Sequence, residues 1–126
     1  MARSAKSVQV AVTTEYLENQ SSPAEDQYLF SYTITITNLG IEAVTLKSRH
    51  WCITDADGGT SEVQGAGVVG ETPLIKPNDS YQYSSGTVLK TPLGVMQGHY
   101  AMQTNDGEEF NAPIPAFRLA VPGLLH

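Results

Sequence analysis

The sequence predicts an all-β domain, on the basis of apolar residues that alternate with period two and of frequent glycines and prolines between them. The clearest alternation covers residues 28–37, where even positions are aromatic or branched apolar residues and odd positions from Ser31 onward carry hydroxyl groups. Such alternation is typical of a strand with one buried face. The 11 glycines and 7 prolines interrupt most windows in which a helix could form. We therefore expect almost no helix.

The other strands are expected in sequence order. Residues 7–13 repeat the alternation, and further short segments are rich in β-branched or aromatic residues, at 43–46, 51–54, 80–83, 99–103 and 116–121. Turn-forming residues separate them at 38–40, 57–59, 77–79, 91–94 and 105–107, and residues 18–27 read as a polar loop. Connections this short leave no room for crossover helices. They predict a two-sheet antiparallel sandwich of immunoglobulin or fibronectin type III style, with a small closed barrel as the alternative.

Length and composition predict one globular domain spanning residues 1–126. A chain of 126 residues with 40% hydrophobic and 16% charged residues can bury a core large enough to fold without disulfides or metals. The net charge of −6, from 7 basic and 13 acidic residues, repels polyanions, so nucleic acid is not an expected partner.

The same features indicate a cytoplasmic protein. The lone Cys52 cannot form an internal disulfide, and the N-terminal residues lack the apolar segment of a signal peptide. No stretch approaches the roughly 20 continuous apolar residues that a membrane-spanning helix needs, so no membrane role is expected.

A glycine pattern is the most conspicuous candidate site. Residues 65–70 read Gly-Ala-Gly-Val-Val-Gly, so Gly65, Gly67 and Gly70 fit the G-x-G-x-x-G spacing. In dinucleotide-binding proteins this spacing lets backbone amides approach a pyrophosphate at the start of a helix. The three glycines are therefore candidate phosphate-binding residues.

The residues around this pattern favour another interpretation. Pro73 follows almost at once, so no helix is expected to begin there. Glu62 and Glu71 flank the glycines and oppose an anion, although successive amides can bind anions without a helix. We expect the glycines mainly to permit a tight, bulged connection between strands, with phosphate binding as the alternative.

Metal and catalytic sites are not expected. Residues 55–59 begin like a calcium loop but lack its later ligands, and a hairpin turn explains them better. His50 and Cys52 share one face of a strand, yet one cysteine and three histidines form no cluster with zinc spacing. No serine lies in a nucleophile-elbow sequence. Trp51, the single tryptophan, is expected to anchor the core between the sheets.

The sequence resembles the ApaG family over nearly its whole length. The resemblance is strongest at residues 49–55, which read Arg-His-Trp-Cys-Ile-Thr-Asp, and at residues 62–71, which contain the glycines. Further blocks agree in order, at 20–23, 83–86, 89–94, 96–100 and 114–117. The family usually has Pro-Gly where this chain has Pro77-Asn78, a mild departure because asparagine also tolerates the left-handed backbone conformation.

The resemblance implies a fibronectin type III-like sandwich found in bacteria, an association with cobalt tolerance and magnesium efflux, and no established catalytic activity or cofactor. Similar domains in eukaryotic F-box proteins and in a DNA-polymerase-interacting protein imply protein recognition. The glycine pattern has prompted a pyrophosphate-binding proposal for the family. We therefore expect a non-enzymatic module that binds a protein partner as yet unidentified. A weak pyrophosphate- or nucleotide-binding protein that uses Gly65, Gly67 and Gly70 is the alternative.

Overall fold

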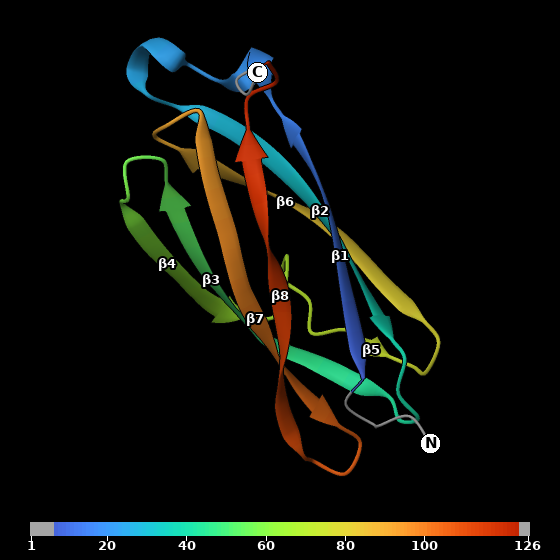
Figure 1. Cartoon of the computed structure of the whole chain (residues 1–126). Helices are drawn as coiled ribbons and strands as arrows, with labels where there is room; N and C mark the ends of the chain where they lie inside the picture. Colours follow the sequence, from blue (N-terminus) through green and yellow to red (C-terminus); the bar gives the residue numbers. More distant parts are fainter. Residues whose placement is uncertain (1–6, 124–126) are drawn as a thin grey trace.

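The computed structural model describes residues 7–123, whose strands form two antiparallel sheets (Figure 1). The first sheet has the order β1-β2-β6, where β1 is Val8–Tyr16, β2 is Tyr28–Asn38 and β6 is Ser80–Leu89. The second has the order β4-β3-β7-β8, where β3 is Val44–Asp55, β4 is Thr60–Ala66, β7 is Leu93–Thr104 and β8 is Glu109–Ala120. The short strand β5, Leu74–Ile75, pairs with the start of β3.

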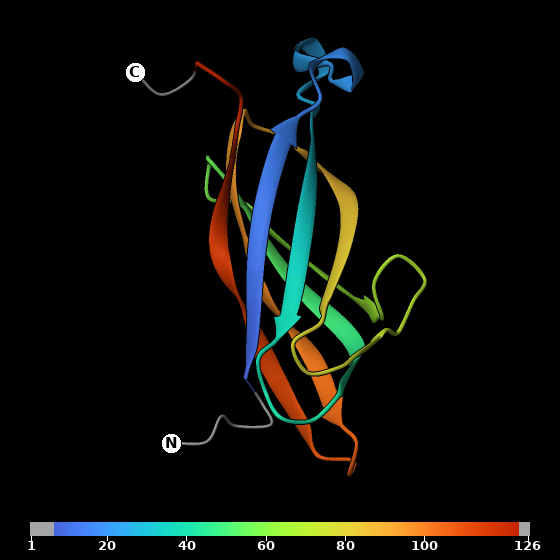
Figure 2. The same cartoon turned by 90° about the vertical axis from the view of Figure 1, so that its right-hand side faces the viewer.

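The sheets pack face to face, so the predicted sandwich is confirmed and the closed barrel is not formed (Figure 2). The described residues contain no α-helix, also as expected. The predicted polar loop contains two short 3₁₀ turns, η1 at Glu18–Gln20 and η2 at Pro23–Glu25. Asn78 has a φ of 69°, so it adopts the left-handed conformation that its place in the turn had suggested.

Strand β3 corrects one prediction. Its residues were expected to form two separate strands, 43–46 and 51–54, but they form one strand with a bulge between Leu46 and Ser48. The extra residue, Lys47, reverses which positions point inward. Leu46 is buried before the bulge and Trp51 after it, an odd spacing that breaks the period-two pattern.

The other differences concern strand length. β4 and β5 were not predicted, and β6, β7 and β8 are longer than the expected segments 80–83, 99–103 and 116–121. The early half of β8 contains Pro113 and Pro115, and proline is uncommon inside a strand because it lacks a backbone N–H. β8 is the last strand of its sheet, where a missing N–H is tolerated.

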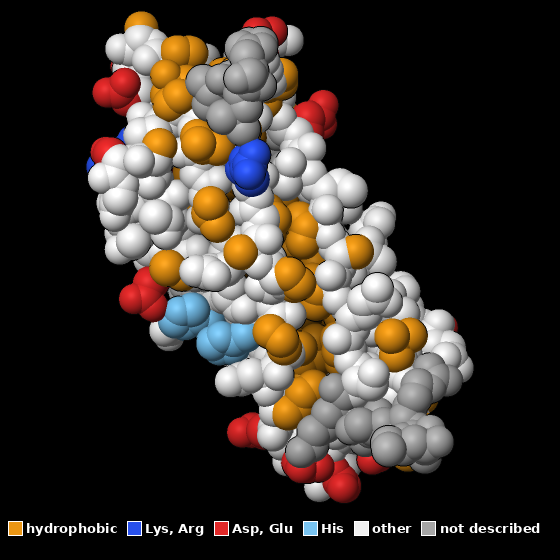
Figure 3. All heavy atoms as spheres, viewed as in Figure 1, with side chains coloured by type: hydrophobic (Ala, Val, Ile, Leu, Met, Phe, Trp, Pro, Cys, Tyr) orange, Lys and Arg blue, Asp and Glu red, His pale blue; other side chains and the backbone are white. Residues whose placement is uncertain are grey.

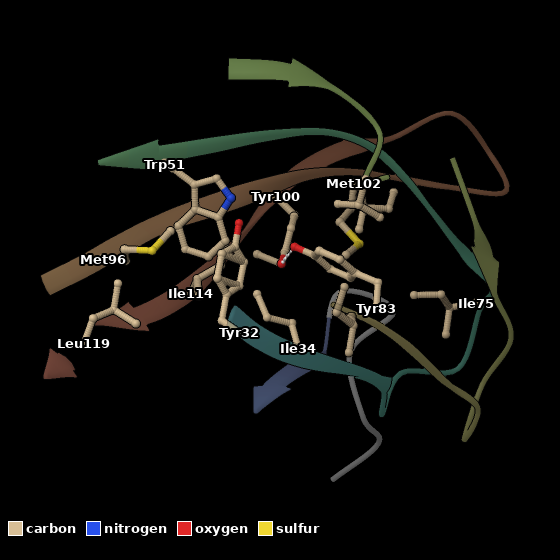
Figure 4. Packing of buried hydrophobic residues seen from close by; sticks show 14 of the residues in the cluster. Tyr32, Ile34, Trp51, Ile75, Tyr83, Met96, Tyr100, Met102, Ile114 and Leu119 are labelled. Atoms are coloured by element: carbon tan, nitrogen blue, oxygen red, sulfur yellow. Dashed lines mark hydrogen bonds between the residues drawn. The ribbon is translucent and has the colours of Figure 1, made fainter. Parts of the chain in front are cut away.

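The core lies between the sheets (Figure 4). Trp51 is 2% exposed and packs edge-on against Tyr32, Tyr100 and Phe117, which confirms its predicted role as a core anchor. Its indole N–H has no acceptor among the described residues, so packing alone holds the side chain.

Two buried tyrosines connect the sheets through their hydroxyl groups (Figure 4). The hydroxyl of Tyr83 on β6 lies 2.5 Å from that of Tyr100 on β7. Burial raises the pKa of Tyr83 from 10.0 to about 12, and burial raises the pKa of Tyr100 still further. Both side chains are therefore held in the neutral form.

Candidate functional site

Strand β4 is the part of the second sheet that the first sheet does not cover. Six of its seven residues are exposed, and the seventh, Gly65, is half-buried. Val63 faces the same side as its register partner Trp51 but is 42% exposed. β4 also ends the strand order of its sheet, so one side of its backbone has no neighbouring strand.

The backbone groups of β4 alternate between the two sides. The N–H of Gly67 donates to Lys47, and the carbonyl of Gly59 accepts from Asp55, so odd-numbered residues point towards β3. The N–H and C=O groups of Thr60, Glu62 and Gln64 therefore point to the free edge. A row of unpaired N–H and C=O groups like this one can form backbone hydrogen bonds with another extended segment.

Arg49 crosses the end of this edge. Gly65 is its register partner, and the guanidinium lies flat over that glycine, where a Cβ would be 2.8 Å from Nη1. Nη1 donates to the carbonyls of Ala66 and Gly67, at 3.1 and 2.9 Å. Gly65 thus leaves the space that this half-buried guanidinium fills. Sequence reasoning missed Arg49 as a site residue, because only the strand register brings it to Gly65.

Gly67 and Gly70 shape the connection after β4. Gly67 has a φ of 61°, and a Cβ there would overlap with the Glu71 carbonyl oxygen. Val68 and Glu71 bond to each other through both backbone N–H groups, at 2.8 and 2.9 Å, around a two-residue turn. Val69 and Gly70 form that turn with φ of 43° and 81°.

This geometry matches the tight connection that we expected from the glycines. No helix begins after them among the described residues, and the amides of Gly67, Val68 and Glu71 already donate to backbone carbonyls. Few amides are therefore left to surround an anion. Phosphate binding by Gly65, Gly67 and Gly70 stays a prediction.

A polar hollow of about 500 Å³ borders the same strands and is lined by Ser48, Arg49, His50, Gln64, Gly65 and His99. His50 and His99 stack with ring centroids 5.1 Å apart, and the two pale blue side chains lie together at the surface in Figure 3. Both ring nitrogens of His50 have partners, Gln64 at 2.9 Å and Glu62 at 2.9 Å.

Neither metal binding nor thiol chemistry finds support in these contacts. Within residues 7–123 no three His, Cys, Asp or Glu side chains are grouped so as to hold a metal ion. Cys52 shares the outer face with His50 as predicted, but the imidazole is bonded to Gln64 and Glu62. Residues 55–59 form the turn between β3 and β4, with Gly58 at a φ of 87°. His126 lies outside the described residues.

The remaining sheet edges are less open. β1 and β8 lie beside each other, and Figure 3 shows a stripe of hydrophobic side chains where they meet. Pro113 and Pro115 interrupt the row of donors on β8. β6 has a free edge, but its inward residues Tyr83 and Leu89 are buried under the second sheet. Among the strands of residues 7–123, β4 alone exposes its edge and both faces together.

Comparison with known proteins identifies the family. The family model of the ApaG domain matches residues 18–104, which include the glycine pattern and Arg49. The chain belongs to the ApaG domain family. It is 73% identical over 122 residues to Protein ApaG of Shewanella pealeana, covering 97% of each chain. It is 68% identical over 126 residues to Protein ApaG of Shewanella halifaxensis, covering all of both chains.

Two solved structures of similar proteins have the same fold. The ApaA protein from Bordetella pertussis is 41% identical, superposes with a TM-score of 0.93, and covers 98% of this chain and 99% of its own. The structural genomics target SoR45 is 66% identical with a TM-score of 0.92, covering 97% and 92%. No helix in residues 7–123 is long and apolar enough to cross a membrane.

Proposed function

We propose that this ApaG domain is a non-catalytic protein-binding module and that β4 is the strand on which it receives its partner. The observation that carries the proposal is the exposure of β4, whose free edge and both faces are accessible. An extended segment of another protein can add to such an edge through backbone hydrogen bonds. A cytoplasmic location, expected from the sequence, and a connection to cobalt tolerance and magnesium efflux, implied by the family resemblance, belong to this proposal.

The β4 backbone supports the proposal in a second way. The outward groups of Thr60, Glu62 and Gln64 provide three pairs of donors and acceptors in register. β4 contains neither proline nor lysine, the residues that commonly protect an edge strand from pairing. Val63 adds an exposed apolar side chain beside this row.

Two matched proline substitutions test the proposal. Gln64→Pro removes an outward N–H from the β4 edge, and Gln82→Pro removes an outward N–H from the β6 edge. Each also removes one side-chain hydrogen bond, from Gln64 to His50 or from Gln82 to Thr35. Proline is tolerated at such edge positions, so both variants are expected to fold.

The readout is crosslinking followed by affinity purification from the source cells, scored for proteins and for small molecules. We expect a set of proteins to be captured by the wild type and by Gln82→Pro. The Gln64→Pro variant should not capture them. If Gln82→Pro alone loses them, β6 is the binding edge and our assignment of β4 is wrong. If both variants capture the same proteins as wild type, the partner uses neither edge.

Phosphate binding is the second candidate, and Arg49 is the observation in its favour. The guanidinium at Gly65 and Gly67 is a cation beside the glycine pattern. Glu62 and Glu71 oppose an anion there, and backbone bonds occupy most nearby amides. We therefore expect pyrophosphate and ADP, with and without magnesium, to give no saturable binding below about 1 mM. Saturable micromolar binding centred on these residues, lost in a folded Gly67→Ala variant, would promote this candidate over protein binding.

A further inference from the structure

We propose that β4 selects extended segments with a fixed order of side chains: an acidic residue, any residue, an apolar residue and a basic residue. This inference rests on the proposed function and names the chemistry of its partner. Three side chains along the free edge carry it, namely Arg49, Val63 and Glu62, and each faces a different position of an added strand.

Arg49 provides the acidic preference. Nη1 is engaged by two backbone carbonyls, and no carboxylate among the described residues pairs with the guanidinium. A half-buried guanidinium with remaining N–H donors favours a carboxylate, which it can bind through charge-assisted hydrogen bonds. Since Arg49 lies over Gly65 on the inner face, the carboxylate is expected from the partner residue opposite Gly65 on that face.

Val63 provides the apolar preference. It points to the same face as Gly65, two residues earlier in β4, and is 42% exposed. Its register partner on β3 is the buried Trp51. An apolar side chain of the added strand would cover Val63 and so enlarge the buried apolar surface of this face. Cross-strand apolar pairs of this kind stabilise strand addition.

Glu62 provides the basic preference. It lies on the outer face, where its side chain is 65% exposed and its carboxylate is 2.9 Å from His50 Nε2. Its own N–H and C=O point to the free edge, so a strand residue paired with it lies directly opposite. A lysine or arginine there is attracted to Glu62, whereas an acidic residue is repelled.

The order follows from antiparallel pairing. The added strand runs in the opposite direction to β4. Its consecutive residues, read from its N-terminal side, therefore lie opposite Gly65, Gln64, Val63 and Glu62. They are acidic, unrestricted, apolar and basic in turn. A segment with the two charges exchanged places a basic residue beside Arg49 and an acidic residue opposite Glu62, so both contacts are repulsive.

Two synthetic peptides of identical composition test this order on the full chain. The first is acetylated and amidated Thr-Thr-Glu-Thr-Val-Lys-Thr-Thr, and the second exchanges its glutamate and lysine. We expect amide NMR shifts centred on Thr60, Glu62 and Gln64 with the first peptide. We expect association at least about tenfold weaker with the exchanged one, which replaces two attractive pairs by two repulsive pairs.

Charge reversal at the exposed Glu62 gives a further control. In Glu62→Lys, a peptide with glutamate at the basic position should bind better than the original peptide. Glu109→Lys, at the exposed start of β8, changes the net charge equally and should not alter the preference. Equal binding of both peptides at the β4 amides would overturn the charge order while leaving edge addition in place. Absence of shifts from either peptide at 1 mM would overturn the inference, and the proline variants would still judge the proposed function.

Discussion

Trp51 and Val63 occupy paired positions on neighbouring strands and point to the same face of one sheet, yet Trp51 is 2% exposed and Val63 is 42% exposed. The difference comes from the other sheet, which covers β3 and ends before β4. Burial on this face thus depends on coverage, not on strand pairing. The same backbone pattern therefore provides core anchoring at one position and an accessible surface at the next.

The strongest test of this comparison is Trp51→Ala. Because Trp51 fills the covered side and packs against Tyr32, Tyr100 and Phe117, its loss should lower the free energy of unfolding by about 3–5 kcal/mol. Urea unfolding followed by circular dichroism measures the change. A variant that melts at the wild-type temperature would show that coverage by the first sheet does not stabilise this position.

Gly67→Ala tests the connection that follows the uncovered strand. The left-handed φ and the overlap of a Cβ with Glu71 should together lower the free energy of unfolding by about 2–4 kcal/mol. Gly58→Ala is the matched control, since Gly58 also has a positive φ but a Cβ there meets nothing within 4 Å. Equal losses in the two variants would mean that φ alone matters and that the close approach at Gly67 does not.

The stability of the fold at alkaline pH tests the covered region through its buried tyrosines. The pKa of Tyr83 is about 12 in the folded state and near 10.0 when exposed, so the fold binds the proton more tightly than the unfolded chain does. This contribution is fully present below pH 10 and is lost as pH rises towards 12. Tyr83 alone should account for about 2–3 kcal/mol of that loss, and Tyr100 adds to it.

Urea unfolding between pH 8 and pH 12 measures this dependence. The double variant Tyr83→Phe and Tyr100→Phe should flatten the alkaline part of the curve, since it removes both buried hydroxyl groups. An unchanged slope in the double variant would mean that other groups cause the alkaline loss.

The smallest effect is expected for Val63→Ala. A side chain that remains 42% exposed loses little apolar burial, so the free energy of unfolding should fall by less than about 1 kcal/mol. Denaturant unfolding beside Trp51→Ala gives the comparison directly. A loss as large as that of Trp51→Ala would mean that β4 is covered in solution, for example by a second copy.

Much of the fold could be predicted because period-two alternation reports coverage of one face. β2 was predicted almost to its ends, since every second residue is buried along most of its length. β4 lacks that signal, because a strand exposed on both faces shows no alternation of burial. In β3 the bulge at Lys47 changes the phase of the pattern, and the sequence then reads as two short strands.

Only part of the candidate site could be predicted from the sequence. The spacing of Gly65, Gly67 and Gly70 marked a special backbone, and the positive φ at Gly67 and Gly70 gives the reason. The roles of Arg49 and Val63 depend on which residues lie opposite each other across β3 and β4. Register is a long-range property that neighbouring residues in the sequence do not encode, so these side chains could not have been selected beforehand.

The prolines of β8 bear on how far strand addition can go. If β4 of one molecule received β8 of another, the sheet would continue from molecule to molecule as an open-ended fibre, since such a head-to-tail contact does not close on itself. Pro113 and Pro115 remove two of the outward N–H donors that this contact would use. The chain thus has an open edge on β4 and an interrupted row of donors on β8, which opposes self-polymerisation through this sheet.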